Sequence, residues 1–378
     1  MRRPLVIVSP LLPPLHGGLA DHTHELARHL QEHFAVSVVS TRDVYTSAPF
    51  QVRAVIHDWD DGFEIWQELS PIPPDAVILW QYVPHMYGRG GVNRALPKLW
   101  KALKDQGRHQ VILAHEIAAP WGNRPNHWWY AYHHRRQWKA ALACADLIPF
   151  STEAWLEEWS ARERKRADRF FLLPSPTSIP VEAVPADHRQ AWRAKHGIPD
   201  NTRVLLWFGT VNVTKQLPWV VNAWEAANRQ GTPTVLGVIG GNPPLAIPGG
   251  LRERYRAFGY LPPEDVSRAL HAADLLVLPF VDGASERRTT LMAGLAHGVA
   301  VLSTVGHNTG DTLAGADFIE ATPADQPAEF IRQASDLLRD PAELDRLAQA
   351  GRAQYAQAYS WPVVVKTLRE RLAAIGLD

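Results

Sequence analysis

The stretch that decides the fold is residues 279–304, PFVDGASERRTTLMAGLAHGVAVLST. An apolar run leads into a turn of small and basic residues, and a helix-forming segment and a second apolar run follow it. Such a turn directs backbone N–H groups and the positive end of the helix toward one point, where they stabilise an anion. Side-chain donors are added there by Ser285, Arg287, Arg288, Thr289 and Thr290. The sequence therefore predicts a phosphate site.

Strand-forming apolar runs alternate with helix-forming segments on both sides of this stretch. Examples are LVIVS, AVILW and QVILAH in the first half and RVLLWFG, TVLGVIG and DLLVLPF in the second. This alternation predicts parallel sheets with helices on both faces, so the predicted class is α/β and doubly wound. The series restarts near Val204, after a stretch from Pro174 to Asp200 that carries five prolines. We interpret that stretch as a linker between two Rossmann-like domains.

The composition is that of a globular enzyme without a large net charge. With 378 residues the chain is too long for one hydrophobic core and fits two domains. Basic and acidic side chains both number 39, so no overall field attracts nucleic acid, and we expect no nucleic-acid partner. The single cysteine, Cys144, can form neither an internal disulfide nor a thiolate metal cluster, which fits a reducing cytoplasm.

The amino-terminal stretch PLVIVSPLLPPL, which follows Arg2 and Arg3, has the apolar character of a signal peptide. Its four prolines would break the apolar helix that a signal peptide needs, so we expect a buried strand instead. No other apolar stretch of the sequence reaches bilayer-spanning length. The expected location is cytoplasmic, and a peripheral contact with a membrane stays open.

Gly17 and Gly18 come directly before a helix-forming segment. Glycine lets the backbone approach a ligand closely and a helix start favours a phosphate oxygen, although a plain strand-to-helix turn would need the same residues. His22, His24 and Glu25 follow, but side chains two positions apart on a helix point in different directions. We therefore predict no catalytic metal.

Two later strands of the first half end in polar residues, namely Gln81 and Tyr82, and His115 and Glu116. Open α/β sheets bind ligands at the carboxyl ends of their strands, although an aromatic or histidine residue there often belongs to the core. We interpret the aromatic segment 121–134, WGNRPNHWWYAYHH, as core packing. Trp121 is the expected exception, because it lies beside a glycine and soon after His115.

The turn D-G-x-S-x-R-R at 282–288, followed by a small-residue helix that ends in A-H-G, resembles the donor-binding signature of one branch of the retaining glycosyltransferases of family 4. The resemblance implies the GT-B fold, in which two Rossmann-like domains face a cleft. It implies an acceptor-side domain over 1–180 and a nucleotide-sugar domain over 181–358. A last helix over 359–378 would cross back to the first domain.

The resemblance also implies roles for single residues. Lys215 occupies the position of a lysine that neutralises the departing phosphate, and His115 that of a histidine that contacts the transferred sugar. Donor contacts are implied for Gly17, Gly18, Gly209, Thr210, Lys215, Phe258, Gly259, Tyr260, Leu261, Gly283, Ala284, Ser285, Arg287, Arg288, Thr289 and Thr290. Acceptor-side contacts are implied for Gln81, Tyr82, Arg89, Glu116 and Trp121.

The sequence departs from the family pattern at the two glutamates of the common donor motif, where it has Ser285 and Ala293. Asp282 or Glu286 could replace the first glutamate, and we place Asp282 among the catalytic residues. Nothing obvious replaces the second, which would hold the ribose.

A third departure is Thr210, which stands where the family commonly has an arginine. Arg287 or Arg288 could supply the missing charge. With these substitutions, the resemblance implies retaining transfer of a sugar to a hydroxyl acceptor from a UDP-, GDP- or other nucleoside diphosphate sugar. The leaving diphosphate would take the acceptor's proton, so no separate general base and no cofactor are expected.

The departures from the pattern motivate an alternative from another class, a non-catalytic protein that binds a nucleotide sugar or a partner. An epimerase of similar two-domain form is less favoured, because it needs further carboxylates that the sequence does not place. A Rossmann dehydrogenase is disfavoured because no G-x-G-x-x-G follows the first strand. The sequence leaves the sugar, the base, the acceptor and the oligomeric state undetermined.

Overall fold

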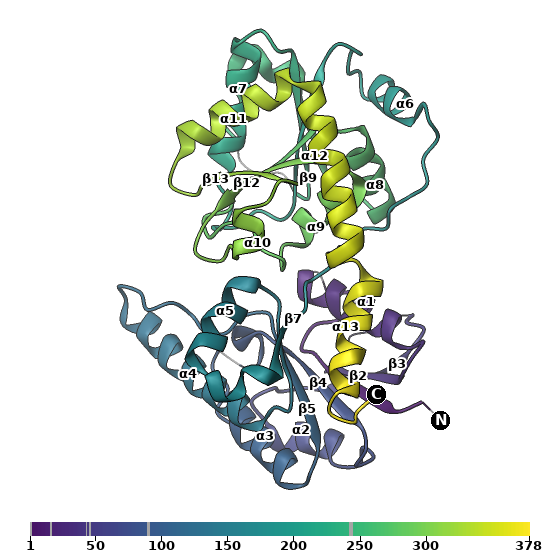
Figure 1. The fold of residues 1–378 in the computed structure, drawn as a ribbon, viewed down its shortest axis with the longest axis vertical. Coiled ribbons are helices and arrows are strands. Elements are labelled where there is room, and N and C mark those ends of the chain that lie inside the picture. The colour runs from purple at the N-terminus through teal and green to yellow at the C-terminus, as the bar shows by residue number, and fades with distance from the viewer. Residues whose placement is uncertain (1, 16, 43, 45–46, 89–90, 242–244) are drawn as a thin grey trace. The chain divides into compact units, whose positions relative to one another are not determined.

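The structure is a computed structural model, and it describes residues 2–15, 17–42, 44, 47–88, 91–241 and 245–378. The chain divides into two compact units, each with a parallel sheet flanked by helices (Figure 1). The first unit comprises Met1–Ser151, Leu156–Pro174 and Trp361–Asp378, and the second comprises Thr152–Trp155 and Ser175–Ser360. The long segment of the second unit thus begins at Ser175, close to the domain start at 181 that the sequence predicts, and the short segment Thr152–Trp155 belongs to that unit as well.

Seven parallel strands form the sheet of the first unit, in the order β3-β2-β1-β4-β5-β6-β7. They are β1 (Pro4–Val8), β2 (Ala35–Thr41), β3 (Gln51–Ile56), β4 (Val77–Tyr82), β5 (His109–Ala114), β6 (Ile148–Phe150) and β7 (Phe170–Leu172). The apolar amino-terminal run forms β1, which pairs with β2 on one side and β4 on the other. The prediction of a buried first strand is therefore confirmed.

Helices cover both faces of this sheet, because its strands are apolar on both sides. One face packs against α1 (Gly18–Leu30) and α13 (Trp361–Ala373), whose Leu26 and Leu368 share a core with Leu5. On the other face, α3 (Leu96–Asp105) and α4 (Pro125–Cys144) place Trp100 and Trp138 against Tyr82. The remaining helical segments are α2 (Gly62–Leu69), α5 (Glu153–Arg162), η1 (Pro84–Met86) and η3 (Arg164–Arg169).

Six parallel strands form the second sheet, in the order β10-β9-β8-β11-β12-β13. They are β8 (Arg203–Phe208), β9 (Thr234–Ile239), β10 (Tyr255–Gly259), β11 (Leu275–Leu278), β12 (Ala300–Val305) and β13 (Glu320–Pro323). The helical segments are α6 (His188–Lys195), α7 (Leu217–Arg229), α8 (Pro263–Ala272), α9 (Thr289–His297), α10 (Asp311–Ala314), α11 (Pro327–Arg339), α12 (Pro341–Gln354), η4 (Gly249–Arg254) and the π-helical η5 (Tyr355–Tyr359). Both sheets have the predicted doubly wound α/β class.

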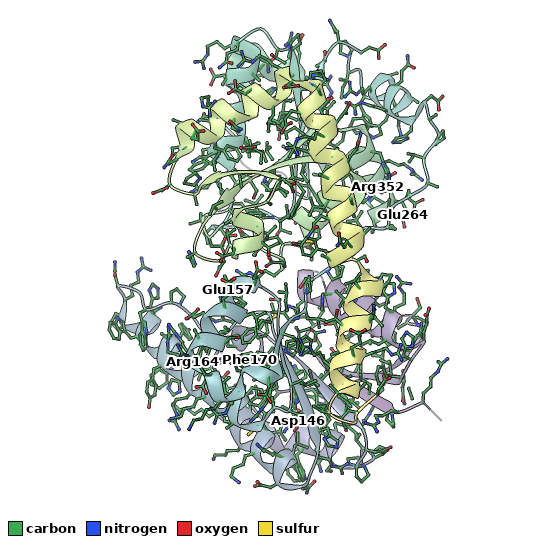
Figure 2. The ribbon with its side chains drawn as sticks, in the orientation of Figure 1. Asp146, Glu157, Arg164, Phe170, Glu264 and Arg352 are labelled. Atoms are coloured by element: carbon green, nitrogen blue, oxygen red, sulfur yellow. The ribbon has the colours of Figure 1, made fainter. Side chains whose placement is uncertain are left out.

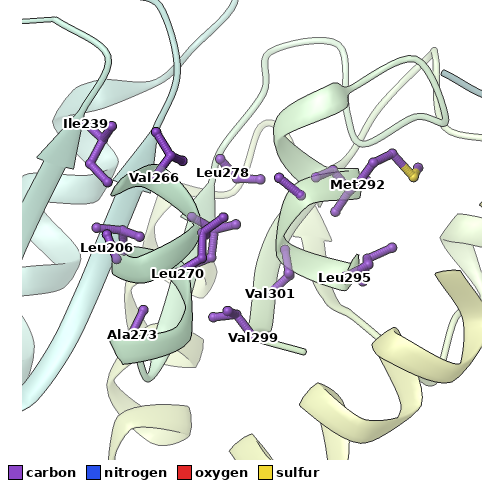
Figure 3. Close-up of a cluster of buried hydrophobic side chains, with 14 of the residues drawn as sticks. Leu206, Ile239, Val266, Leu270, Ala273, Leu278, Met292, Leu295, Val299 and Val301 are labelled. Carbon is purple, nitrogen blue, oxygen red and sulfur yellow. The ribbon is translucent and has the colours of Figure 1, made fainter. Parts of the chain in front are cut away.

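The core of the second unit lies in two layers, one on each face of the sheet. Helices α8 and α9 cover one face, where their side chains meet those of the strands (Figure 3), with Val266, Leu270, Met292 and Leu295 packing on Leu206, Ile239, Leu278 and Val301. Helices α7, α11 and α12 cover the other face. Gly294 lets α9 lie close to the sheet, because a β-carbon there would collide with the side chains of Leu276 and Val301.

Part of the stretch from Pro174 to Asp200 is a folded element of the second unit, so its interpretation as a linker is too wide. Trp192 of α6 and Ile198 are buried in the core beside α8. The α6 residue Arg193 is also buried, and it donates to the carboxylate of Asp274 at 2.6 Å. That carboxylate further accepts from Arg189, Arg203 and the Val204 N–H. Asp274 thereby ties α6 to the amino-terminal edge of the sheet.

Cys144 ends α4 as a buried free thiol. None of the helices in the described residues combines the length and the apolar character that a membrane crossing requires.

We expect Asp274→Ala to destabilise the protein by about 3 kcal/mol, because it leaves the buried Arg193 guanidinium without its carboxylate. Asp336→Ala is the matched control, since Asp336 pairs with Arg332 and Arg339 on an exposed face of α11 and should cost less than about 1 kcal/mol. Denaturant unfolding of both variants measures the difference. Equal costs would show that the buried cluster does not fasten α6.

Candidate functional site

The residues of the second unit that are predicted to bind the donor gather at the carboxyl edge of its sheet. Strand order reverses between β8 and β11, and an open α/β sheet binds ligands outside such a switch point. Gly209 follows β8 on one side of the reversal, and residues 279–290 follow β11 on the other. The sequence thus brings two separate motifs to one place because the strands that carry them are neighbours.

Lys215 is fixed at this edge by a short backbone pairing with the residues that follow β11. Gln216 N–H donates to the Pro279 carbonyl at 2.9 Å, and Val281 N–H donates to the Thr214 carbonyl at 2.8 Å. Lys215 lies between these bonds and bridges to Phe280. Its ammonium lies 5.2 Å from the centre of the Trp207 ring and against Gly209, where a β-carbon would collide with Nζ. Glycine at 209 therefore makes room for the lysine.

The charge of Lys215 is held in an unfavourable environment. Burial and, to a smaller extent, the nearby positive charge of Arg288 together lower its pKa to about 8. Two cations close together in a partly buried position are stabilised when an anion enters. A phosphate group would therefore stabilise the two charges of Lys215 and Arg288, whereas a neutral ligand would not.

The Asp282 carboxylate organises the two arginines of the turn. It accepts from Arg287 at 3.0 Å, from Asn308 at 2.9 Å and from Arg288. Burial opposes its ionisation, but the Arg288 charge, the Asn308 amide and the Arg287 charge outweigh that effect, so the pKa of Asp282 lies below its ordinary value. These contacts use both carboxylate oxygens and favour a positioning role for Asp282 over direct contact with a substrate.

The two arginines differ in their surroundings. Arg288 lies 4.4 Å from the centre of the Phe280 ring, and Phe280 is the residue that bridges to Lys215. Arg287 lies 5.0 Å from the ring of Trp155 instead. Because the charge of Arg288 acts on Lys215, Arg288 is the better substitute for the arginine missing at Thr210.

The backbone of the turn forms a tight cradle at the start of α9. Gly283 has φ +89°, and a β-carbon there would collide with Thr309 and Gly306. Ala284 N–H donates to the Thr304 carbonyl at 2.7 Å, which fastens the turn to β12. Within the described part of the chain, the buried hydroxyl of Ser285 has no hydrogen-bond partner. Helix α9 follows at once.

The first residues of α9 complete the cradle. The first turn of α9 includes Thr289 and Thr290, both half-buried. The amino-terminal N–H groups of this nine-residue helix receive no side-chain cap from the described residues, and the methyl group of Thr290 lies beside Gly209. The arrangement of free N–H groups, the Ser285 hydroxyl and two cations is suited to a phosphate.

Glu286 has a structural role that the sequence analysis misses. Its side chain is fully buried, and Oε2 accepts from the Glu153 N–H at the start of α5 at 3.1 Å. Its own carbonyl accepts from the Ser175 N–H at 3.0 Å. Its burial and its contact at the start of α5 favour Asp282 over Glu286 as the replacement for the missing glutamate.

The turn predicted to hold the base lies at the same sheet edge, after β10. Gly259 has φ +65°, and its carbonyl accepts from the Gly240 N–H at 2.7 Å. Phe258 is half-buried and packs its ring on Trp192 and His196 against the core. Tyr260 is 78% exposed, and Leu261 is half-buried beside it. The backbone at 259–261, not the Phe258 ring, is accessible to a ligand.

Residues of the first unit occupy the carboxyl edge of its own sheet. Gly17 precedes α1 with φ +151°, and no atom approaches the space where Gly18 would carry a β-carbon. His115 follows β5 and donates from Nε2 to Gln81 Oε1. The Gln81 amide in turn lies 3.4 Å from His22 Nδ1. Burial lowers the pKa of His22 to about 4, so His22 stays neutral in this chain of hydrogen bonds.

Tyr82 and Gln81, which the sequence analysis predicts as acceptor-side contacts, are both buried in the structure. Tyr82 is fully buried, donates to Gln137 at 3.3 Å and is surrounded by Tyr87, Trp100 and Trp138, so it is a core residue. Gln81 is buried too and orients His115. Glu116 is half-buried next to His115. Arg89 lies outside the described residues.

The interpretation of segment 121–134 as core packing is wrong for its largest side chains. Trp128, Trp129 and Tyr132 are each at least half exposed, and Trp121 is 47% exposed. Only one face of α4 is buried, and the first two turns carry aromatic residues on the other face as well. The exposure of Trp121, predicted as the exception, is shared by its neighbours.

Several residues of these sites carry no signal in the sequence. Asn308 and Trp155 contact the donor turn from distant parts of the second unit, and a single sequence does not reveal such contacts. Among the described residues, no group of three or more His, Cys, Asp or Glu side chains is close enough together to hold a metal ion.

Comparison with known proteins agrees with this geometry. Residues 202–340, all within the second unit, match a family model described as "Glycosyl transferases group 1". Comparison with curated proteins gives no match. Among solved structures, the sucrose-phosphate synthase of Thermosynechococcus elongatus is similar, with 16% identity over 99% of both chains and a TM-score of 0.73.

Two further structures are similar over nearly the whole chain. HepE of Anabaena, in complex with UDP and glucose, is 13% identical to this chain, and the TM-score is 0.72. The similarity covers 99% of this chain and 100% of the HepE chain. WaaG, a glycosyltransferase involved in lipopolysaccharide biosynthesis, has 18% identity, covers 98% of this chain with 100% of its own, and has a TM-score of 0.71. At these identities the likeness establishes the fold, and the fold is GT-B.

The lowered pKa of Lys215 predicts that anion binding depends on pH. As the pH rises through about 8, Lys215 loses its proton, and we expect binding of inorganic pyrophosphate to weaken by about fivefold between pH 8 and 9. Lys215→Arg keeps its charge over this range and should show no such step. Calorimetric titration of both proteins tests this, and parallel pH profiles would exclude Lys215 from the anion site.

Proposed function

We propose that this protein is a retaining glycosyltransferase that moves a sugar from a nucleoside diphosphate sugar to a hydroxyl acceptor. The observation that carries the proposal is the half-buried cation pair Lys215 and Arg288 beside the uncapped start of α9. The match of residues 202–340 to glycosyltransferases supports it, because that range contains the whole pair and cradle. Neighbours in fold that bind UDP or glucose support a donor of this class.

The chemistry of transfer explains why such a site would accelerate the reaction. When the bond from the anomeric carbon to the diphosphate oxygen breaks, positive charge grows on the sugar and negative charge on the leaving group. Lys215, Arg288, the Ser285 hydroxyl and the N–H groups of α9 would stabilise the leaving diphosphate. They are held by the backbone pairing at Phe280 and by Asp282, so little reorganisation is needed.

A mechanism that retains the anomeric configuration determines how the acceptor oxygen and its proton react. The acceptor oxygen bonds to the anomeric carbon on the face from which the diphosphate departs, and the acceptor proton passes to the departing phosphate oxygen. We assign no side chain as general base. His115, oriented by Gln81, is proposed to contact the transferred sugar, and Gly17 and Gly18 are proposed to approach the diphosphate. Proton NMR of the product would report the anomeric configuration, and an inverted product would overturn the retaining assignment.

A non-catalytic nucleotide-sugar-binding protein is the alternative, since Ser285 and Ala293 replace two glutamates. Incubation with UDP-, GDP-, ADP- and dTDP-sugars separates the two. A transferase should slowly release nucleoside diphosphate even without its acceptor, whereas a binding protein should be stabilised by the sugar without releasing product. A saturating ligand at one hundred times its Kd raises stability by about 2.7 kcal/mol, which a thermal-shift screen detects.

We expect Lys215→Ala to lower kcat by about a hundredfold, because one preformed electrostatic contact to the leaving phosphate is lost. The melting temperature should hardly fall, since removal of a buried charge relieves its desolvation. Donor turnover at saturating donor measures the effect, with thermal unfolding as the control. An unchanged kcat would remove Lys215 from the reaction.

Arg288 and Arg287 form a matched pair for a second test, because both contact Asp282 and only Arg288 acts on Lys215. Arg288→Ala should weaken nucleoside diphosphate binding by about 1.5 to 3 kcal/mol per lost contact and leave nucleoside binding unchanged. Arg287→Ala should have the smaller effect on the diphosphate. Titration of both ligands decides, and equal losses for nucleoside and diphosphate would contradict a phosphate role.

A further inference from the structure

The first unit exposes an aromatic surface that the proposed reaction does not use. Three of its members, Trp128, Trp129 and Tyr132, lie on the outer face of the first two turns of α4, with exposed fractions of 58%, 50% and 52%. Trp121 joins them, with its ring centre 4.8 Å from that of Trp128. We call these four residues the α4 surface. Large aromatic side chains gathered in this way mark an interaction site.

The loop that carries Trp121 is fastened to α4, so the α4 surface is preformed. The Ala119 N–H donates to His134 Nδ1 at 3.1 Å, which leaves His134 Nε2 to donate to the Gly91 carbonyl. Burial lowers the pKa of His134 to about 4, so the neutral ring holds these bonds. Arg135 adds a bond of 2.9 Å to the Ala119 carbonyl.

Arginine side chains lie over three of the four rings. Arg135 lies 4.4 Å from the ring centre of Trp121, Arg94 lies 5.5 Å from that of Trp129, and Arg136 lies 5.9 Å from that of Tyr132. The rings of Trp121, Trp129 and Tyr132 are thus each presented together with a positive charge. The combination suits a ligand that has an apolar region next to anionic groups.

The sequence around the α4 surface is strongly one-sided in charge, although the whole chain is neutral. No acidic residue occurs between Glu116 and Asp146, and Asp146 lies beyond the far end of α4 (Figure 2). Arg124 and Lys139 add exposed cations to those over the rings. Segment 161–169, which contains the Arg164 labelled in Figure 2, has five basic and two acidic residues and lines a cavity of the same unit.

We propose that the α4 surface docks on the head-group region of an anionic lipid bilayer. Tryptophan and tyrosine are favoured at the boundary between head groups and acyl chains, because their rings are apolar and their N–H or O–H groups remain hydrated. The arginines complement the negative surface potential of such a bilayer. A neutral glycan would also stack on the rings, but it would not account for the absence of acidic residues from positions 117–145, so the bilayer is the occupant that the observations favour.

Cosedimentation with sucrose-loaded vesicles tests the proposal on the full chain. We expect binding to vesicles of phosphatidylcholine with about one third phosphatidylglycerol, weaker binding as salt is raised, and little binding to phosphatidylcholine alone. Trp128→Ser with Trp129→Ser, and separately Arg124→Glu with Arg136→Glu, should each lower the partition coefficient by at least about tenfold. These side chains are exposed, so circular dichroism should show normal folding.

Two controls match these variants in kind. Phe63→Ser removes an aromatic side chain that is 66% exposed on α2, and Arg229→Glu reverses an exposed charge on α7, and both should bind vesicles like the wild type. Absence of wild-type binding to anionic vesicles, or equal losses in the controls, would overturn the proposal. Displacement of the protein from vesicles by a soluble neutral oligosaccharide would assign the α4 surface to glycan binding instead. Binding of nucleoside diphosphate is measured in parallel, so failure here is distinguishable from failure of the proposed reaction.

Discussion

The buried carboxylate of Asp282 is the constraint on which the second unit's site depends. One side chain accepts from two arginines in the turn after β11 and from an asparagine in the loop after β12. Because the carboxylate is buried, its charge would be costly without these partners, and the partners are in turn confined to one geometry. The turn between β11 and α9 is therefore rigid before any ligand arrives.

Lys215 is held at this turn by backbone hydrogen bonds and not by a contact of its side chain with Asp282. The residues flanking Lys215 pair with those flanking Phe280, and Arg288 lies over the Phe280 ring. The positions of Lys215 and Arg288 therefore both depend on the position of Phe280. A like-charge pair is unfavourable by itself, and the fold tolerates it because Asp282 compensates the arginine side. The remaining excess of positive charge is what an anion would neutralise.

The sequence predicts well those features that depend on the backbone and on strand order. Apolar runs fix the strands, parallel strands bring their carboxyl ends to one edge, and so the positions of Gly209 and of the turn at 282–288 follow. It predicts poorly which face a side chain occupies. Tyr82 and Gln81 are adjacent in one strand that is buried on both faces, so both are internal. The sequence does not predict that Glu286 caps a helix, because the helix that it caps begins at Glu153, far away in the chain.

For the aromatic residues of α4 the sequence also fails to predict which face a side chain occupies, but here residues predicted to be buried are exposed. Their number suggests a core, because large apolar side chains are usually buried. The buried face of α4 is already filled by residues such as Trp138 and Ala141, and the helical period leaves Trp128 and Tyr132 on the other face. Neutrality of the whole chain similarly hides a local excess of arginine around these rings. Composition averages over surfaces, so a chain with no net attraction for anionic partners can still present one face that binds them.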